Sequence, residues 1–356
     1  MRNIASDIIR AIALLQIILY HSWVLCKNVS PSAPNVPLLI SYGGEIGVTC
    51  FFVLSGFGIY YSLNKMDNNK SLSFTSFAKK RCIRILPHYY FSLIISVFLL
   101  DGAYWLSKEN AWAIISHFLF LHTFSPNAQG AVNGVLWTMG VIIHYYIIAI
   151  PIYILFKKHP LIVYTTSIIT TILLSSLTNY INTQHTFVAC RQIWTSLDNF
   201  VAGMLIAYFI KYDKLHIKKI VFKISFLLIS LSVFFTCIRV RNLMIGKDTL
   251  FNTAYFSILS MSISIIILAL SQFQINQSNY LVKPLLIVSN YEYGIYIWHL
   301  LIINNLITKS PLFVTMLNNG NYKTTYCLLL LISIIIGIIM SKLVDSWSCK
   351  QLAHKK

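Results

Sequence analysis

Charged side chains are scarce in this sequence. They make up 11% of its 356 residues, and acids are the scarcest, with only ten Asp and Glu. A soluble domain carries charge on about a quarter of its residues, so an ordinary soluble protein is excluded. Hydrophobic residues account for 57% of the chain. We predict an all-α, polytopic integral membrane bundle of about ten transmembrane helices, over residues 8–25, 46–63, 88–107, 133–156, 160–178, 194–211, 219–238, 250–271, 285–307 and 324–345.

Because acids are rare, the chain has a net charge of +18. Such a balance can indicate nucleic-acid binding. In membrane proteins, however, Lys and Arg gather in cytoplasmic loops, and a cytoplasmic N-terminus with ten spans places most of the basic residues there. The charge therefore predicts topology, with both termini cytoplasmic and no nucleic-acid partner. Membrane lipids and phosphorylated ligands are the expected anionic partners. Three basic residues fit poorly because they fall on the outer side: Arg239, Arg241 and Lys247.

Metal-binding and disulfide patterns are also missing. The seven cysteines are scattered, with no CxxC pair and no Cys/His pair at zinc spacing. We expect them to pack as small apolar residues, and we expect no metal site. No small-residue cleavage site follows the first apolar segment, which is therefore predicted to be a span rather than a signal peptide. With no internal repeat, residues 1–356 are expected to form one membrane domain without an appended soluble domain.

The first apolar segment, DIIRAIALLQIILYH, residues 7–21, carries the ionisable residues Asp7 and Arg10 at its start and His21 at its end. A charge at the centre of a membrane helix costs roughly 2.5–3.5 kcal/mol, so such residues indicate a functional site. Arg10 and His21 are eleven residues apart. This spacing places them on nearly the same helix face, about 16 Å apart along the axis. We predict that they form a polar line through most of the bilayer.

The second apolar segment begins with a glycine-rich stretch, GGEIGVTCFFVLSGFGIYY, residues 43–61. Its small residues allow another helix to approach closely. The stretch also contains Glu45, one of the ten acids of the chain. We expect this carboxylate at the outer end of the second span, near the depth of His21.

Four basic residues precede the third span, in the stretch AKKRCIRILPHYY: Lys79, Lys80, Arg81 and Arg84. Arg81 and Arg84 share one helix face. Two interpretations are open. The stretch is a cytoplasmic anchor flanked by interfacial tyrosines, or the two arginines bind phosphate, for which arginine supplies forked donors that lysine lacks.

Further histidines lie in three other segments. His117 and His122 fall within residues 112–124, which are too short for another span and are expected to form an interfacial or re-entrant helix. His144 is expected near the middle of the fourth span, hydrogen-bonded to a neighbouring helix. His299 is fourteen residues into its predicted span, in SNYEYGIYIWHLLI. That is about 21 Å along the axis, at a depth similar to that of the histidine in the first span.

Taken together and in this order, the motifs resemble the membrane acyltransferase family 3, integral membrane enzymes that O-acylate bacterial surface polysaccharides and related acceptors. The resemblance runs over essentially the whole chain. The motifs that carry it are Asp7-x-x-Arg10 with His21, GVTCFFVLSGF, Arg81/Arg84–Pro87, Leu136–Trp137, the helix with Gly203, and YGIYIWH.

The resemblance implies essential roles for Arg10 and His21 and donor handling by Arg81 and Arg84. It implies an enzyme of the bacterial inner membrane that transfers an acyl group, with acetyl as the default. The expected acceptor is a hydroxyl of a lipid-linked or polymeric glycan such as an O-antigen, capsular polysaccharide or exopolysaccharide. The expected donor is a cytoplasmic acyl-coenzyme A, with its phosphates held by these two arginines and by Arg10. The oligomeric state is left open.

The chain departs from the family pattern at two positions where acids are often found. Thr49 stands at one of them, and Ile142 or Ile143 stands near the other. The chemistry of those acids cannot be done by the same side chains here. Glu45 and His144 are candidates to replace them.

Acyl transfer to a hydroxyl needs a base for the hydroxyl proton and donors for the oxyanion. We expect His21 to be the general base, since its unperturbed pKa near 6.5 suits proton transfer at neutral pH. Glu45 is expected to orient it, and His299 to serve as oxyanion donor or second base. An acyl-histidine relay is equally compatible with the sequence.

A transporter or polysaccharide flippase is the competing class, because intramembrane Arg and His also mark transport pathways. The absence of a repeated half and of paired broken helices counts against it. A sensor or structural membrane protein would leave the polar line unexplained.

Overall fold

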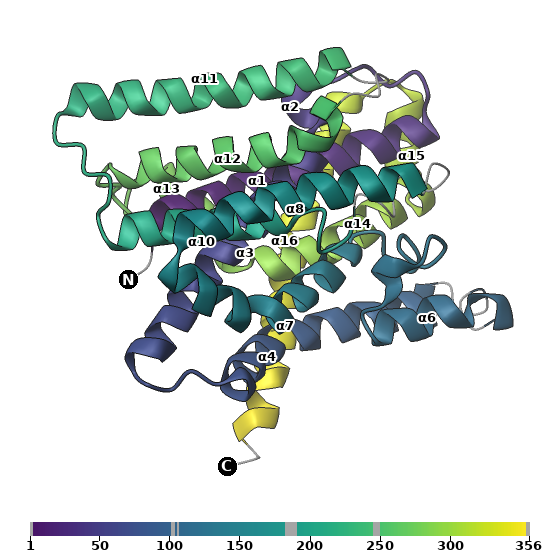
Figure 1. The fold of residues 1–356 in the computed structure, drawn as a ribbon. Coiled ribbons are helices and arrows are strands. Elements are labelled where there is room, and N and C mark those ends of the chain that lie inside the picture. Colours follow the sequence, from purple (N-terminus) through teal and green to yellow (C-terminus); the bar gives the residue numbers. More distant parts are fainter. Residues whose placement is uncertain (1–2, 101–103, 105–106, 182–190, 245–249, 354–356) are drawn as a thin grey trace. The chain divides into compact units, whose positions relative to one another are not determined.

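The computed structural model describes the whole chain except residues 1–2, 101–103, 105–106, 182–190, 245–249 and 354–356. Its described residues form helices and turns and no β-strand (Figure 1), so the predicted all-α fold is confirmed. The elements are α1 Ile4–Val29, α2 Leu38–Ser41, α3 Gly43–Asn68, α4 Phe74–Ile94, η1 Ile95–Leu100, η2 Lys108–Asn110, α6 Ala111–Phe118, η3 His122–Phe124, α7 Trp137–Lys158, α8 Pro160–Ile181, α10 Leu197–Lys211, α11 Ile220–Met244, α12 Leu250–Ser271, α13 Val282–Asn290, α14 Glu292–Lys309, α15 Pro311–Asn318 and α16 Tyr322–Ala353.

Seven helices in the described part of the chain are long and apolar enough to cross a membrane: α1, α3, α7, α8, α11, α12 and α16. The pair α13 and α14, which is bent by 80° at its break, forms an eighth candidate. The predicted multi-pass bundle is therefore confirmed, and the predicted count of about ten is approximate.

Two predicted spans account for the difference. In place of 88–107, helix α4 begins earlier, at Phe74, and includes the whole basic stretch before it passes into the π-helix η1. Residues 101–103 and 105–106 of that predicted span lie outside the described residues. In place of 194–211, helix α10 has only 15 residues, and ten of them are buried. A helix that is buried on all sides belongs to a protein core, which explains why it needs no membrane-spanning length.

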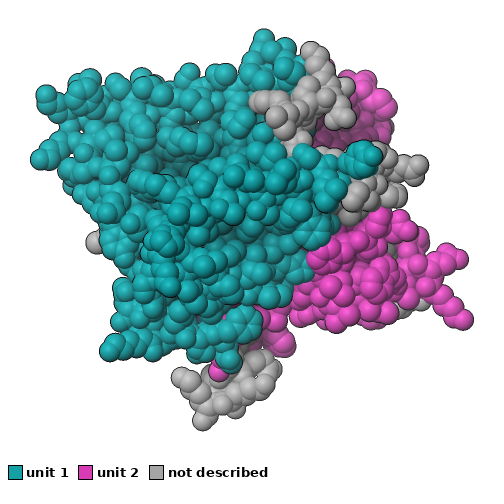
Figure 2. Space-filling model, in the orientation of Figure 1, with its two compact units in different colours: residues 1–13, 45–77, 141–286 teal, residues 14–44, 78–140, 287–356 magenta. Residues whose placement is uncertain are grey.

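The helices group into two compact units, coloured separately in Figure 2. Unit 1 comprises residues 1–13, 45–77 and 141–286, and unit 2 comprises residues 14–44, 78–140 and 287–356. Helix α1 therefore contributes its first part to unit 1 and the remainder to unit 2. Each unit is assembled from segments far apart in the sequence.

In unit 1, glycines bring the backbones of α3 and α10 into contact. A Cβ atom added to Gly56 would lie 1.8 Å from the backbone oxygen of Phe200, and one added to Gly203 would lie 1.8 Å from that of Val53. No side chain can occupy either position without moving a helix. The small-residue face predicted for the second span thus packs against the buried core helix.

In unit 2, α14 and α16 cross closely in antiparallel directions. A Cβ atom at Gly294 would lie 1.8 Å from Oγ of Ser341, and one at Gly337 would lie 2.7 Å from Cα of Ile295. Helices α1 and α3 also meet in this unit, since a Cβ atom at Gly43 would lie 2.6 Å from the backbone oxygen of Gln16. These contacts fix the helices that carry His21 and His299.

We predict that Gly56→Ala destabilises the protein by about 1–3 kcal/mol, the usual cost of overpacking a tight core. The matched control is Gly58→Ala in the same helix, where an added Cβ atom has no neighbour within 4 Å. The control is expected to be neutral or slightly stabilising, because alanine favours a helix over glycine. Thermal unfolding of both variants in detergent measures the difference, and equal unfolding temperatures would contradict the tight contact.

Candidate functional site

His21 and His299 lie next to each other in unit 2. Their ring centroids are 5.2 Å apart. His21 comes from α1 and is partly exposed, whereas His299 comes from α14 and is fully buried. Counting residues along two separate helices predicted only that the two imidazoles share a depth. The structure adds that they are neighbours.

The hydrogen bonding of His299 determines which of its ring nitrogens is available. Its Nδ1 donates to the backbone carbonyl of Tyr296 at 2.6 Å, because a carbonyl oxygen can only accept. In the neutral ring, Nε2 then carries the lone pair, and this buried atom has no hydrogen-bond partner among the described residues. An imidazole in this state accepts a proton and cannot donate to an oxyanion. Of the two roles predicted for His299, the geometry favours that of a base.

Side chains near the Leu136–Trp137 motif hold α14 in place. The amide of Asn133 donates to the backbone oxygen of Ile297 at 3.0 Å. The hydroxyls of Thr138 and Tyr296 are 2.9 Å apart. All three side chains are buried, so they fix the turn of α14 that carries His299. The sequence analysis did not single out Asn133 and Thr138. The one signal available was that both are polar residues next to the Leu136–Trp137 motif within an apolar segment.

Arg10 has an ionic partner within its own helix. Helix α1 begins after Asn3, whose side-chain oxygen accepts a hydrogen bond from the backbone N–H of Ser6 at 2.9 Å. One turn further, the Arg10 guanidinium is 3.6 Å from the carboxylate of Asp7. Their side chains are 22% and 11% exposed. The Asp7-x-x-Arg10 motif is therefore an ion pair in unit 1, which explains how the helix tolerates this arginine.

Glu45 forms an ion pair with Arg241 in unit 1, with an N–O distance of 3.3 Å. The Arg241 guanidinium also lies 4.9 Å from the ring centroid of Tyr255, a cation–π contact. Arg241 did not fit the predicted charge distribution of the loops. Its ion pair with Glu45 and its contact with Tyr255 explain why a basic residue lies at this position. Arg239 is exposed, and Lys247 lies outside the described residues. The orientation of His21 by Glu45 stays a prediction.

Helix α4 has a polar face and an apolar face, which adjoin at Phe91. Arg81, Arg84 and His88 follow one another at spacings of three and four residues, which places them on one face. Arg84 is exposed, Arg81 is partly buried and His88 is buried. Another face lines an apolar groove of about 430 Å³, formed by Cys82, Ile83, Leu86, Pro87, Tyr90, Phe91, Ile94 and Trp347 of α16. The two arginines thus start a polar face that continues into the protein.

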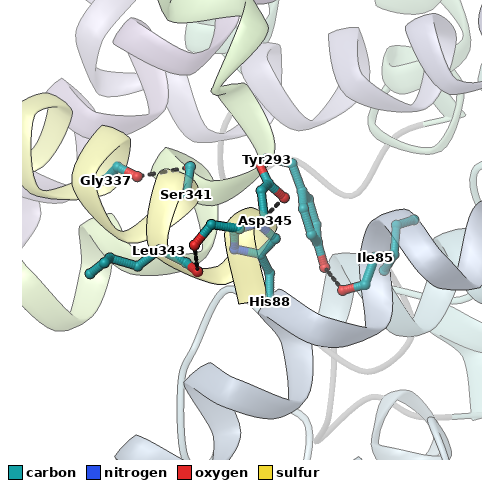
Figure 3. A network of polar contacts seen from close by, with 8 residues as sticks. Ile85, His88, Tyr293, Gly337, Ser341, Leu343 and Asp345 are labelled. Carbon is teal, nitrogen blue, oxygen red and sulfur yellow. Dashed lines mark hydrogen bonds and ion pairs between the residues drawn. The ribbon is translucent and has the colours of Figure 1, made fainter. Parts of the chain in front are cut away.

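Figure 3 shows how His88 joins α4 to α14 and α16. Its Nε2 is 3.2 Å from Oδ1 of Asp345, and its ring packs edge-on against Tyr293 with centroids 5.5 Å apart. The Tyr293 hydroxyl donates to the backbone oxygen of Ile85 at 2.9 Å. These contacts hold the arginine-bearing helix against the helix that carries His299. His88 lies in the basic stretch that precedes the third predicted span, but its role could not be predicted without knowing that Asp345 is its partner.

His117 and His122 form a stacked pair, with centroids 4.1 Å apart and planes 8° apart. Both residues are fully buried. His117 donates from Nδ1 to the backbone oxygen of Ala113 at 2.7 Å, and His122 hydrogen-bonds through Nε2 to that of Leu136 at 3.1 Å. Helix α6 is too short to span a membrane, as predicted for this segment. Burial lowers the pKa of His117 to about 4.

We predict that the protein loses stability as the pH falls from about 6.5 toward 4, because the unfolded chain then binds a proton that folded His117 excludes. The depressed pKa corresponds to a loss of up to roughly 3 kcal/mol. His117→Phe keeps a ring to stack on His122 and removes this titration, so its thermal stability should vary less over that pH range. His159→Ala, at an exposed histidine, is the control and should keep the wild-type pH dependence. Parallel curves for wild type and His117→Phe would exclude His117 as the cause.

The positions that lack the family's acids hold neutral side chains in unit 1. Thr49 is buried and its hydroxyl donates to the backbone oxygen of Glu45 at 2.8 Å. Ile142 is buried in α7 beside partly exposed Ile143. His144 follows in the same helix and is partly exposed. Replacement of the missing acids by Glu45 and His144 stays a prediction.

The described residues hold no group of three or more His, Cys, Asp or Glu side chains arranged to bind a metal ion. Five cysteines among these residues are free: Cys26, Cys50, Cys82, Cys237 and Cys327. The candidate site of unit 2 therefore consists of imidazoles, guanidinium groups, a carboxylate and aromatic rings. Such groups can bind anions and move protons.

Comparison with known proteins gives one match. A family model described as an acyltransferase domain, that of acyltransferase family 3, matches residues 3–342. The matched region includes segments of both compact units. No curated protein and no solved structure matches the chain.

Proposed function

We propose, from the premise that this chain belongs to acyltransferase family 3, that it moves an acyl group from cytoplasmic acyl-coenzyme A to a hydroxyl of a surface glycan. Membership of the family makes the protein a membrane acyltransferase. The observation that carries the finer proposal is the imidazole pair of His21 and His299, with one buried lone pair left open. An open base beside a second imidazole suits proton transfer from a hydroxyl.

The donor assignment rests on helix α4. Arg81 and Arg84 present forked donors at the start of the face that packs, through His88, against α14. Phosphates of coenzyme A would bind at these arginines, and the thioester would reach toward His299 along the same unit. Arg10 is a further candidate phosphate ligand, and its guanidinium lies 3.6 Å from the carboxylate of Asp7.

The reaction is then a direct transfer. His21 takes the proton of the acceptor hydroxyl, the oxygen attacks the thioester carbonyl, and the carbon–sulfur bond breaks. The thiolate of coenzyme A leaves and takes the proton back from the His21 imidazolium. The open Nε2 of His299 accepts a hydrogen bond from that imidazolium and stabilises it. In the relay alternative, one imidazole carries the acyl group between the two substrates.

The acceptor we propose is a lipid-linked or polymeric glycan, with acetyl as the acyl group. The multi-pass bundle and the excess of basic residues support a place in the bacterial inner membrane, with both termini in the cytoplasm. Transport remains the second candidate on the ground of intramembrane Arg and His, but the family match supports acyl transfer. Mass spectrometry of surface glycans separates the two, since an enzyme adds an acyl increment whereas a flippase is needed for the whole polymer.

We predict that His21→Ala lowers acyl transfer by about 10²–10⁴-fold, the usual contribution of a general base. Assays in proteoliposomes with labelled acetyl-coenzyme A and a glycan acceptor measure the loss. His159→Ala, at an exposed histidine, is the matched control and should keep wild-type activity. A His21→Ala enzyme that transfers at the wild-type rate would exclude His21 as the base.

His299→Leu tests the second imidazole. We expect an activity loss of at least about tenfold, because the Leu side chain cannot accept the hydrogen bond that stabilises the His21 imidazolium. Incubation with labelled donor and no acceptor, followed by peptide mass spectrometry, distinguishes the mechanisms. Label that is retained on either histidine supports the relay, whereas the absence of label together with full loss of transfer in His21→Ala supports direct transfer.

A further inference from the structure

Several buried polar atoms of unit 2 have no hydrogen-bond partner among the described residues, and two of them lie between the arginines of α4 and the imidazole of His299. Nδ1 of His88 and Nε1 of Trp298 have no hydrogen-bond partner among the described residues. The two residues are only 3% and 4% exposed. Buried polar atoms are nearly always paired, and an exception in a native structure calls for a specific cause. A ligand that supplies the missing partners is one such cause.

The two atoms have opposite hydrogen-bonding character. His88 places Nε2 at 3.2 Å from a carboxylate oxygen of Asp345, which can only accept. Nε2 is therefore the donor, and Nδ1 of the neutral ring is an acceptor. The indole N–H of Trp298 can only donate. A ligand that satisfied both atoms would present a donor to one and an acceptor to the other.

Both residues belong to the seam between α4 and α14. His88 contacts Tyr293, and one turn later Phe91 contacts Trp298 with centroids 5.9 Å apart. The order of contacts is the same along both helices, so α4 and α14 run parallel here. Arg84 precedes Phe91 by seven residues on α4, about 10 Å along the axis.

The seam therefore connects the two ends of the proposed reaction. Arg84 lies at its beginning, on the same face of α4 as His88. At the other end, Trp298 is followed directly by His299 in α14. A donor molecule with its phosphates at the arginines and its thioester at the imidazoles would follow this seam.

We propose that the seam binds the pantetheine arm of acyl-coenzyme A through its secondary amides. Nδ1 of His88 accepts a hydrogen bond from an amide N–H, and Nε1 of Trp298 donates one to an amide carbonyl. A secondary amide offers one hydrogen-bond donor and one acceptor. Nδ1 of His88 needs the donor, and Nε1 of Trp298 needs the acceptor. This inference rests on the proposed function and adds to it the two residues that recognise the arm.

Binding of two probes to the purified full-length protein tests the inference. Coenzyme A carries the arm, whereas adenosine 3′,5′-bisphosphate carries phosphates and lacks it. Trp298→Phe removes the indole N–H and keeps a ring against Phe91. We expect this variant to bind coenzyme A about tenfold more weakly and the bisphosphate with wild-type affinity. Trp347→Phe, at an exposed tryptophan of α16, is the matched control and should bind both probes as the wild type does.

A Trp298→Phe protein that binds coenzyme A as tightly as wild type would overturn the inference and leave the proposed function standing. Equal weakening for both probes would also overturn it, because the loss would then not depend on the arm. A wild-type protein that binds neither probe would overturn the acyl-coenzyme A donor itself.

His88 provides an independent test of the acceptor. His88→Gln keeps a side-chain oxygen that can accept from an amide, whereas His88→Leu does not. We expect coenzyme A to bind His88→Leu about tenfold more weakly than His88→Gln, and the bisphosphate to bind the two equally. Equal affinity for coenzyme A in the two variants would exclude the acceptor role.

Discussion

The constraint on which this structure depends is the cost of leaving a polar group unpaired where no water can reach it. The chain meets that constraint with partners inside the protein. Arg10 pairs with Asp7, Glu45 with Arg241, and His117 with the backbone of its own helix. These partners leave some buried polar atoms unpaired among the described residues, including nitrogens of His299, His88 and Trp298. All three residues belong to unit 2, on α14 or in contact with it. A bound substrate could supply the missing hydrogen-bond partner of each nitrogen.

Residue counting along the helices predicted much of the architecture and the most informative pair of the site. The apolar segments predicted the helical bundle, and residue counting placed His21 and His299 at a similar depth. That their rings are neighbours is known only from the structure. Counting could not give the partner of Glu45, because Arg241 is 196 residues away. It also could not give the break between α13 and α14, since hydropathy records how apolar a segment is and not its direction. No proline or glycine marks the break at Tyr291.

Helix α4 shows why one basic stretch supported two interpretations. Its lysines Lys79 and Lys80 are exposed, as an anchor at the membrane surface requires. Its arginines begin a face that continues through buried His88 to the contact between Phe91 and Trp298. Exposed lysines at the start of the helix and arginines that lead to buried His88 can serve both roles, so the two interpretations do not exclude each other. Three-residue and four-residue spacing pointed to the arginine face, but the carboxylate that orients His88 comes from α16, far along the chain.

The asymmetry between the two imidazoles bears on how the site would distinguish its acceptor. His21 is partly exposed, whereas His299 is fully buried with a lone pair that has no partner among the described residues. Such an unpaired group costs about 1–3 kcal/mol in the unliganded protein. A substrate recovers that free energy only if it brings a hydrogen-bond donor, directly or through the His21 imidazolium. In the proposed reaction, this cost would favour an acceptor with a hydroxyl. Burial of His299 would also limit the access of water, whose attack would hydrolyse the thioester.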